Sequence, residues 1–462
     1  MSLFKSLFFG VFIFIFLVAY SFVFEQIPYL NQNFKQIHVL PFLQKSLSKD
    51  FSVRDEVVFS NQIAFLENFK NQKALEAFMD SVEAVNRYTG SQTGLIHFFQ
   101  SLKQTEKSSG KTRIGHYGDS MIEGDLITMT LRKYFQRDFG GEGVGFMPIT
   151  SVTNDFRITV KHEFSKGWIL KSHVAGKKDT FDFGISGEYF IPANDTANLN
   201  VRYTAKKRQF LSTFPKSTLY YGVNDSIETS KYNSVIFDED TFLLSGTKKV
   251  NQLVLSQQAQ TELDLNFNFH FQQPIYGVAL ESTKGVIVDN FATRGSAGIP
   301  LTLISNNSIR QFNQYLDYKL IVLHFGVNVL SGKTNYNWYK NSMKRVINHF
   351  KQNMPNTSIL VISIADKSYK NDEDKMETDP AIPLIVKAQR EAARETDAAF
   401  FNLYEAMGGE NSMIKWVEEL EYANKDYTHL NFKGAEFAAS LLYQFLIEEY
   451  EIFKNQTALH DE

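Results

Sequence analysis

The sequence contains no cysteine. That absence excludes a disulfide framework, a zinc site ligated by cysteine and catalysis by a thiol. The chain also has no basic run or stripe, and its formal net charge over 462 residues is only −3. Nucleic acid is therefore not an expected partner, because its phosphate backbone is bound by clustered lysine and arginine.

Ligand patterns for a metal are missing as well. The chain has no His-Glu-x-x-His motif and no compact cluster of His and Asp side chains. We therefore expect no catalytic metal. Apolar residues, by contrast, make up 43% of the chain, enough for a sizeable core. The length favours two or three structural units rather than one.

A long apolar run lies near the N-terminus. Leu7–Phe24 holds 18 uncharged residues, which as a helix would span about 27 Å, close to the thickness of a bilayer core. Lys5 precedes the run and Glu25 follows it. The positive-inside rule then predicts that residues 1–24 are an uncleaved membrane anchor. The rest of the chain would be extracytoplasmic, and periplasmic in a Gram-negative bacterium.

The alternative for this run is a cleaved signal peptide. Ala19 and Ser21 form only a poor small-x-small cleavage site, and the bulky Phe22 and Phe24 stand close by. The anchor is therefore the favoured interpretation.

Three kinds of pattern divide the remaining chain. Residues 25–104 are mixed polar and apolar and predict a helical stalk or lead-in. Residues 150–282 contain period-two stretches such as Leu263–Phe269, separated by turn residues, and predict an inserted all-β sandwich or jelly roll. Residues 105–149 and 283–455 alternate apolar strands with amphipathic helices, which is typical of a parallel sheet covered on both faces.

The strands and helices of that alternating unit can be placed approximately. The expected strands are Arg113–Tyr117, Gly285–Asn290, Leu320–Phe325, Ile359–Ile364 and Ala399–Leu403. The expected helices are one directly after Ser120 with its apolar face at Ile127, Leu131, Phe135 and Phe139, and three more near Trp338–Lys351, Ile382–Glu395 and Phe432–Phe453.

Ser120 ends a Gly-Asp-Ser triplet at a strand-to-helix junction. Active sites of open α/β sheets lie beyond the carboxyl ends of strands, and a helix N-terminus offers free N–H groups to a developing oxyanion. Ser120 could therefore be both a nucleophile and an oxyanion donor. The alternative is an ordinary helix cap, a position that Asp and Ser favour anyway.

Asp426 and His429 stand in Asp-Tyr-Thr-His, just before the last helix. Their separation of three allows the carboxylate to orient the imidazole while the other ring nitrogen faces a serine. The alternative is a surface Asp and a helix-start His. Two further residues could complete an oxyanion hole: Asn328 after the strand Leu320–Phe325, and Gly295 after the strand from Gly285. Both could instead be ordinary loop residues.

These four features occur in one order, and the set resembles the sequence blocks of the SGNH (GDSL-like) hydrolases. The resemblance covers roughly 105–150 and 283–455. It implies a flavodoxin-like, three-layer fold with Ser120, Asp426 and His429 as the catalytic triad. It also implies an oxyanion hole made of Ser120, Gly295 and Asn328.

The run His116–Ser120, the following Glu123-Gly124-Asp125 and the β insert resemble bacterial peptidoglycan O-acetylesterases. Two departures from the pattern, Val329 and Arg294, could alter substrate choice. The resemblance implies an esterase without a cofactor, acting on an O-acetylated extracytoplasmic polysaccharide, with peptidoglycan as the first candidate. An O-acetyltransferase with the same triad and a non-catalytic glycan-binding envelope protein are the alternatives.

Four other polar residues near the Gly-Asp-Ser triplet or in the neighbouring strand are expected to have structural rather than catalytic roles. Glu123 and Asp125 are expected to complement the helix dipole in the first turn. His116 and His324, each within an apolar strand, are expected to be core histidines with their hydrogen bonds satisfied.

Overall fold

The structure, a computed structural model, describes residues 92–107, 110–177, 179–194, 197–223, 232–332 and 334–458. The predicted anchor at 1–24 and most of the predicted lead-in at 25–104 lie outside these residues. The chain divides into two compact units, and the fold described below lies in the unit Phe69–Lys454 apart from residues 455–458 at its end. Among the described residues, no helix combines the length and the apolar character that a bilayer crossing requires.

A five-stranded parallel sheet forms the centre of the α/β part, in the order β13-β1-β14-β15-β18. Numbered along the chain, this is the 2-1-3-4-5 order of flavodoxin-like sheets. Its strands are β1 (Lys111–Gly118), β13 (Gly285–Ala292), β14 (Tyr318–His324), β15 (Ser358–Ile362) and β18 (Ala399–Phe401). The apolar runs predicted all five strands, with ends that differ by no more than about two residues, because a strand buried on both faces needs continuous apolar sequence.

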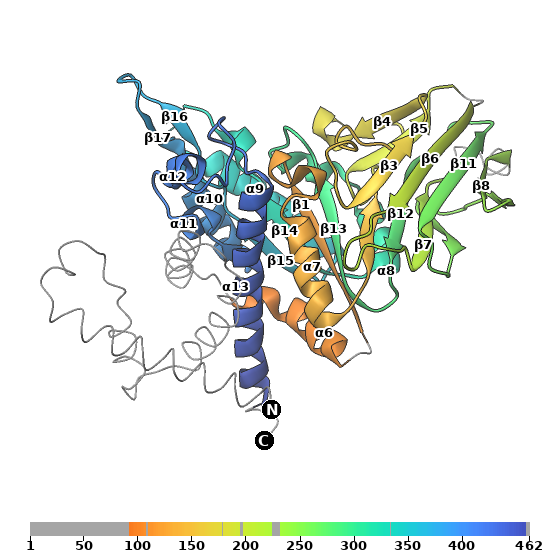
Figure 1. The fold of residues 1–462 in the computed structure, drawn as a ribbon, viewed down its shortest axis with the longest axis horizontal. Coiled ribbons are helices and arrows are strands. Elements are labelled where there is room, and N and C mark those ends of the chain that lie inside the picture. The colour runs from red at the N-terminus through yellow and green to blue at the C-terminus, as the bar shows by residue number, and fades with distance from the viewer. Residues whose placement is uncertain are drawn as a thin grey trace, which may run out of the picture. The chain divides into compact units, whose positions relative to one another are not determined.

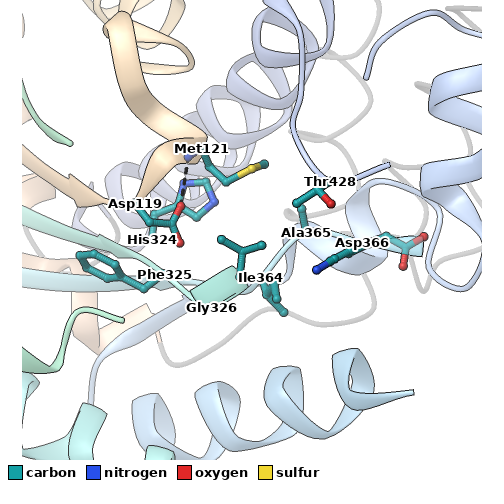
Figure 2. Close-up of a pocket in the computed structure, with 11 residues that line it drawn as sticks. Asp119, Met121, His324, Phe325, Gly326, Ile364, Ala365, Asp366 and Thr428 are labelled. Atoms are coloured by element: carbon teal, nitrogen blue, oxygen red, sulfur yellow. Dashed lines mark hydrogen bonds between the residues drawn. The ribbon is translucent and has the colours of Figure 1, made fainter. Parts of the chain in front are cut away.

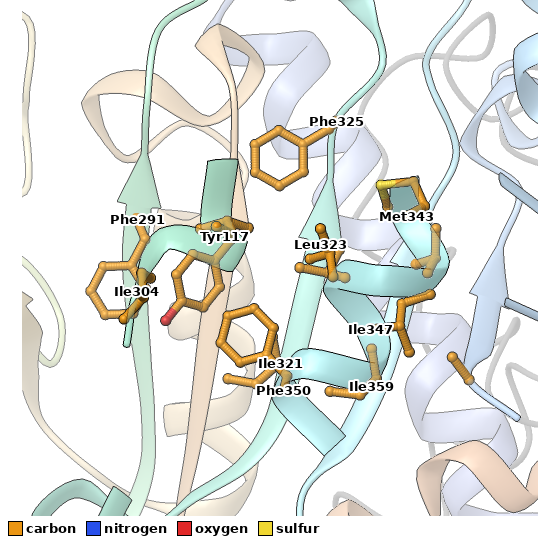
Figure 3. Close-up of a cluster of buried hydrophobic side chains, with 14 of the residues drawn as sticks. Tyr117, Phe291, Ile304, Ile321, Leu323, Phe325, Met343, Ile347, Phe350 and Ile359 are labelled. Carbon is orange, nitrogen blue, oxygen red and sulfur yellow. The ribbon is translucent and has the colours of Figure 1, made fainter. Parts of the chain in front are cut away.

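One face of this sheet is covered by α8 (Asn306–Leu316), α9 (Asn337–Asn353) and α10 (Ala381–Glu395). Alternate strand side chains, among them Tyr117 and Leu323, enter a common core with Phe350 of α9. Figure 3 shows these side chains between the helix and the strands. The amphipathic spacing predicted α9 and α10 on this face, whereas α8 was not among the predicted helices.

The other face is covered by α6 (Ile96–Glu106), α7 (Thr128–Phe139) and α13 (Phe432–Ala458) (Figure 1). Aromatic contacts join these helices to one another and to the sheet. Phe135 of α7 contacts Phe98 of α6 at 5.9 Å and Tyr443 of α13 at 4.9 Å between ring centroids. Phe401 of β18 contacts Phe445 of α13 at 5.2 Å. Helices on both faces of the sheet make three layers.

The helix expected directly after Ser120 starts later than the sequence predicted. Ser120–Asp125 is a short 3-10 helix, η2, and α7 begins only at Thr128. Gly124, Asp125 and Ile127 adopt φ values of +61°, +73° and +61°. These left-handed conformations cannot continue a right-handed helix, so they separate the two elements.

Two antiparallel sheets form the β insert. One contains β3 (Val160–Phe164), β6 (Ala197–Ala205), β11 (Glu262–Phe269), β8 (Ser234–Phe237) and β9 (Asp240–Leu243). The other contains β10 (Asn251–Ser256), β7 (Lys216–Tyr221), β12 (Ile275–Glu281), β5 (Glu188–Pro192) and β4 (Trp168–Ser172), with β2 (Gly143–Met147) paired to β12. The period-two stretch is strand β11, which buries Leu263, Leu265, Phe267 and Phe269 between the sheets.

Short elements complete the described fold. They are η1 (Gln92–Leu95), η3 (His173–Ala175), η5 (Ile299–Leu303), η6 (Val327–Val329), β16 (Ser368–Lys370), β17 (Met376–Thr378), α11 (Leu403–Ala406) and α12 (Ser412–Glu418).

The insert packs closely on the α/β part. Tyr276 of β12 lies 5.2 Å from Phe312 of α8 between ring centroids, within one shared apolar core. The buried Arg113 of β1 donates to Asp289 of β13 at 2.6 Å and also pairs with Glu281 of β12. This contact ties the second sheet of the insert to the central parallel sheet.

Candidate active site

Three strand ends define the edge of the sheet where the predicted site residues lie. Gly118, the last residue of β1, pairs with Ala292 at the end of β13 and with His324 at the end of β14. The loops that follow these strands therefore leave the sheet side by side. They carry the predicted nucleophile and both predicted oxyanion residues, so parallel pairing brings together residues that are far apart in the sequence.

Ser120, His429 and Asp426 form a continuous hydrogen-bonded chain. Ser120 Oγ lies 2.8 Å from His429 Nε2, and His429 Nδ1 lies 2.7 Å from Asp426 Oδ2. A carboxylate on Nδ1 selects the tautomer that leaves Nε2 as an acceptor for the serine hydroxyl. This is the arrangement by which a histidine can take a proton from a serine.

The loop before α13 holds Asp426 in place. Its Oδ1 accepts hydrogen bonds from the N–H groups of Thr428 and His429, both at 3.0 Å. Burial would raise the pKa of Asp426, but these bonds and the His429 side chain outweigh it and lower that pKa. Tyr427 takes a left-handed φ of +51°, which turns the chain between Asp426 and His429. The carboxylate thus stays ionised and faces the imidazole.

Asp119 is a residue whose role the sequence did not reveal. It is only 1% exposed, and its carboxyl accepts from the N–H of Met121 at 3.0 Å and from the N–H of Gly326. Burial raises the pKa of Asp119 to about 6, although the two N–H groups and the nearby His429 oppose this shift. Asp119 therefore joins the turn that carries Ser120 to the loop after β14.

Gly295 and Asn328 lie in the loops on either side of Ser120, and both are exposed. Gly295 has a φ of +75°, and a side chain there would meet only open space, so backbone conformation rather than crowding favours glycine. Asn328 Nδ2 donates to the Ser296 carbonyl at 3.0 Å. An amide nitrogen carries two hydrogens, so this bond fixes the loop and still leaves one hydrogen for an oxyanion.

Comparison with solved structures relates this architecture to that of one esterase. A peptidoglycan O-acetylesterase aligns with a TM-score of 0.65 at 19% identity, covering 79% of this chain and 99% of that one. The chain shares its fold with that enzyme. The resemblance to peptidoglycan O-acetylesterases predicted from the motifs is thus confirmed at the level of the fold.

Two further structures align more weakly. The protein YxiM from Bacillus subtilis has a TM-score of 0.31 at 12% identity, covering 62% of this chain and 90% of that one. A carbohydrate esterase of family 3 from Talaromyces cellulolyticus has a TM-score of 0.27 at 18% identity, covering 35% and 72%. These scores are too low to establish a common fold. No protein-family model and no curated protein sequence matches the chain.

Glu123 binds the neighbouring loop rather than complementing a helix dipole. Arg294 Nε donates to Glu123 Oε1 at 2.8 Å, and Arg294 Nη2 donates to Oε2 at 2.6 Å. Arg294 directly precedes Gly295, so the pair connects the η2 turn to the predicted oxyanion loop. The dipole interpretation was wrong, because η2 breaks at Gly124 and leaves the carboxylate free to face the neighbouring loop.

Asp125 also forms ion pairs instead of complementing a dipole. Fully buried, it accepts from Arg132 at 2.8 Å and from Thr159 at 2.6 Å, and it pairs with Arg157 at 3.2 Å. Burial would raise the pKa of Asp125, but the two guanidinium groups hold it well below its usual range. Through these contacts with Arg157 and Thr159, Asp125 holds the segment before β3 against the η2 turn.

His116 and His324 are buried as expected, but their ring nitrogens lack the expected hydrogen bonds. Their ring centroids lie 5.6 Å apart, and neither ring has a hydrogen-bond partner among the described residues. Burial lowers the pKa of His324 to about 4, and burial together with His324 lowers that of His116. Both rings are therefore neutral at pH 7.

A small cavity of about 10 Å³ lies beside the site. Its lining includes both chain neighbours of Ser120 and the residue before His429, as Figure 2 shows. The lining residues are Asp119, Met121, His324, Phe325, Gly326, Val327, Ile364, Ala365, Asp366, Lys367 and Thr428. Within the described ranges, no group of three or more His, Asp or Glu side chains is arranged to hold a metal ion.

Proposed function

We propose that the chain is a serine esterase that removes O-acetyl groups from an extracytoplasmic polysaccharide, with peptidoglycan as the first candidate. The observation that carries this proposal is the hydrogen-bonded chain from Ser120 through His429 to Asp426 at the carboxyl end of β1. The shared fold with a peptidoglycan O-acetylesterase supports the substrate class.

The reaction begins at the serine hydroxyl. His429 Nε2, 2.8 Å away, takes the proton as Ser120 Oγ attacks the acetyl carbonyl. The imidazole becomes a cation, and the ionised Asp426 at 2.7 Å stabilises it. The N–H groups of Ser120 and Gly295 and the amide of Asn328 receive the oxyanion.

Collapse of the tetrahedral intermediate completes the first half-reaction. His429 returns its proton to the sugar oxygen, which leaves as a hydroxyl, and an acetyl group stays on Ser120. Water, deprotonated by His429, then attacks the acetyl carbonyl, and acetate leaves as Ser120 regains its proton. Every group in this cycle belongs to the chain, the substrate or water, so the cycle uses no cofactor.

Exposure of the triad favours hydrolysis over acetyl transfer. The His429 side chain is 38% exposed and that of Asp426 is 50% exposed. A transferase must keep water from its acyl-enzyme, whereas an open site admits water freely. The esterase is therefore the preferred function, although both activities use the same triad.

The anchor and the β insert suggest where this reaction takes place. We propose that residues 1–24 tether the protein to the membrane with the catalytic part outside the cytoplasm, on the basis of the apolar run and its flanking charges. The insert, residues 150–282, would help to dock the polymer.

Acetate release from O-acetylated peptidoglycan and from other acetylated glycans tests the proposal. Ser120→Ala and His429→Ala should each lower turnover by several orders of magnitude. His97→Ala, at a partly exposed histidine of α6 outside both the triad and the insert, is the control and should retain activity. A fluorophosphonate should label Ser120 in the wild type. Ester hydrolysis that survives in folded Ser120→Ala protein would refute this site.

Transfer of acetyl to an added glycan at the expense of free acetate would identify the transferase instead. Glycan binding without any acetate release would identify the non-catalytic alternative.

A further inference from the structure

Two exposed phenylalanines stack on each other beside the triad. The rings of Phe156 and Phe432 lie 5.1 Å apart between centroids, with 30° between their planes. Phe156 is 44% exposed and Phe432 is 36% exposed. The two residues come from segments far apart in the chain, so the pair exists only in the folded protein. We call it the aromatic wall.

Phe432 is fixed relative to His429. It is the first residue of α13 and follows His429 by three positions. Asn431 caps this helix end, because its Oδ1 accepts from the N–H of Lys433 at 2.9 Å and from that of Gly434 at 3.1 Å. The same short loop thus positions one ring of the wall and the imidazole of the triad.

Phe156 is fixed relative to Ser120. Its ring lies against Gly124 of the η2 turn, where an added Cβ would come within 2.1 Å of Phe156 Cδ1. Arg157 and Thr159, which follow Phe156 in the chain, contact the buried Asp125 at 3.2 Å and 2.6 Å. The ring is therefore held against the turn that begins with the nucleophile.

We propose that the aromatic wall is a sugar-binding subsite that contacts a pyranose ring of the O-acetylated glycan, an inference that rests on the proposed function. A pyranose presents apolar C–H groups on its face and hydroxyl groups at its rim. The wall offers preordered aromatic surface, and polar residues flank it: Asn154 and Asp155 beside Phe156, and Asn431 and Lys433 beside Phe432.

A sugar suits this surface better than an acyl chain does. A long acyl chain would need an apolar groove, whereas polar residues flank both rings of the wall. The wall also needs no movement to bind, because both rings are already held by their own segments. Rigid aromatic anchors lose little conformational freedom on binding.

The test separates the sugar from the ester. Phe156→Ala and Phe432→Ala should each lower kcat/KM on O-acetylated glycan by about 3- to 10-fold, mainly through KM. Hydrolysis of ethyl acetate, which has no ring to stack, should stay unchanged. Leu384→Ala on α10, at a residue of matched exposure (38%), is the control and should change neither activity.

Conservative variants distinguish stacking from packing. Phe156→Tyr should retain glycan activity, whereas Phe156→Leu, which keeps apolar bulk but loses the aromatic face, should lose as much as Phe156→Ala. Equal activity of the Leu and wild-type proteins on glycan would overturn the subsite. So would a parallel loss on ethyl acetate, because the rings would then support the triad.

Failure of the subsite and failure of the esterase have different signatures. If the wild type hydrolyses ethyl acetate and the wall variants match it on glycan, the subsite is wrong and the esterase stands. If the wild type hydrolyses neither ester, titration of a deacetylated glycan oligosaccharide into Ser120→Ala protein still tests the wall. The Kd of this oligosaccharide should be about 3- to 10-fold higher for the double variant with Ser120→Ala and Phe156→Ala than for Ser120→Ala alone. An equal Kd for the two proteins would overturn the subsite.

Discussion

Arg294 donates two hydrogen bonds, of 2.8 Å and 2.6 Å, to the carboxylate of Glu123. These bonds join the loop that contains Gly295 to the turn that contains Ser120. The Arg294 side chain is 69% exposed, whereas that of Glu123 is 10% exposed. The pair, which is exposed only on its Arg294 side, holds a loop whose N–H is proposed to meet an oxyanion. We therefore expect its effect on catalysis to exceed its effect on stability.

Removal of this pair should slow turnover without unfolding the protein. We expect Arg294→Ala and Glu123→Gln each to lower kcat on ethyl acetate by about 3- to 10-fold, because the Gly295 N–H is no longer held toward the oxyanion. The double variant should be no worse than either single one, since the pair acts as a unit. Tm should change little. Additive losses would show that the two residues act separately.

Asn328→Ala should cost about 100- to 1000-fold in kcat, the usual loss for one oxyanion donor, with little change in KM. The effect is confined to turnover because the oxyanion exists only after attack. Steady-state kinetics on ethyl acetate measure the split. Asn335→Ala, at an exposed asparagine of the same connecting segment, is the control. A rise in KM at constant kcat would assign Asn328 to substrate binding instead.

Asp119 should make stability depend on pH in mildly acidic solution. Its pKa is raised to about 6 in the folded protein, so its contribution to stability is full below its ordinary pKa and declines as pH rises through 6. Above pH 6 the buried carboxylate costs about 3 kcal/mol relative to the protonated form.

Urea unfolding of the wild type and of Asp119→Asn from pH 4 to pH 8 measures this dependence. The free energy of unfolding of the wild type should fall relative to that of the variant as pH rises. A constant difference between the two proteins over this range would contradict the assignment.

The cavity beside Ser120 should restrict the acyl group. We expect kcat/KM to be higher for acetyl than for butyryl esters, because about 10 Å³ has little room for added methylenes. Ile364→Ala enlarges the lining and should raise the butyryl-to-acetyl ratio about 10-fold or more. Ile362→Ala removes the same side chain from β15 at a residue that does not line the cavity, and it should leave the ratio unchanged. Equal ratios in both variants would show that the acyl group lies elsewhere.

The apolar run Leu7–Phe24 should keep the full chain in the membrane fraction after an alkaline wash. A chain that starts at Gln26 should be recovered in solution and should still hydrolyse ethyl acetate. N-terminal sequencing of the protein from cells provides the complementary measurement. A mature chain that begins near Phe22 would identify a cleaved signal peptide.

Local sequence determined the strands of the parallel sheet, strand β11 and the candidate residues of the site. Apolar runs specified the parallel strands, because strands buried on both faces tolerate few polar residues. Alternation specified β11, since its side chains point in turn to core and solvent. Asp426 and His429 could be paired from sequence because three residues separate them. Ser120 could be placed because a strand, a tight turn and helical spacing follow one another in the chain.

Only the tertiary structure decided which residues from distant segments of the chain are in contact. Glu123 and Arg294 are 171 positions apart, and whether Glu123 faces a helix end or an arginine depends on which strands pair. The same holds for the stacking of Phe156 on Phe432, and for β2, which follows the α7 segment in sequence but pairs with β12 of the insert. Propensity and periodicity act over a few residues, whereas these contacts follow from strand order and from the packing of one sheet on another.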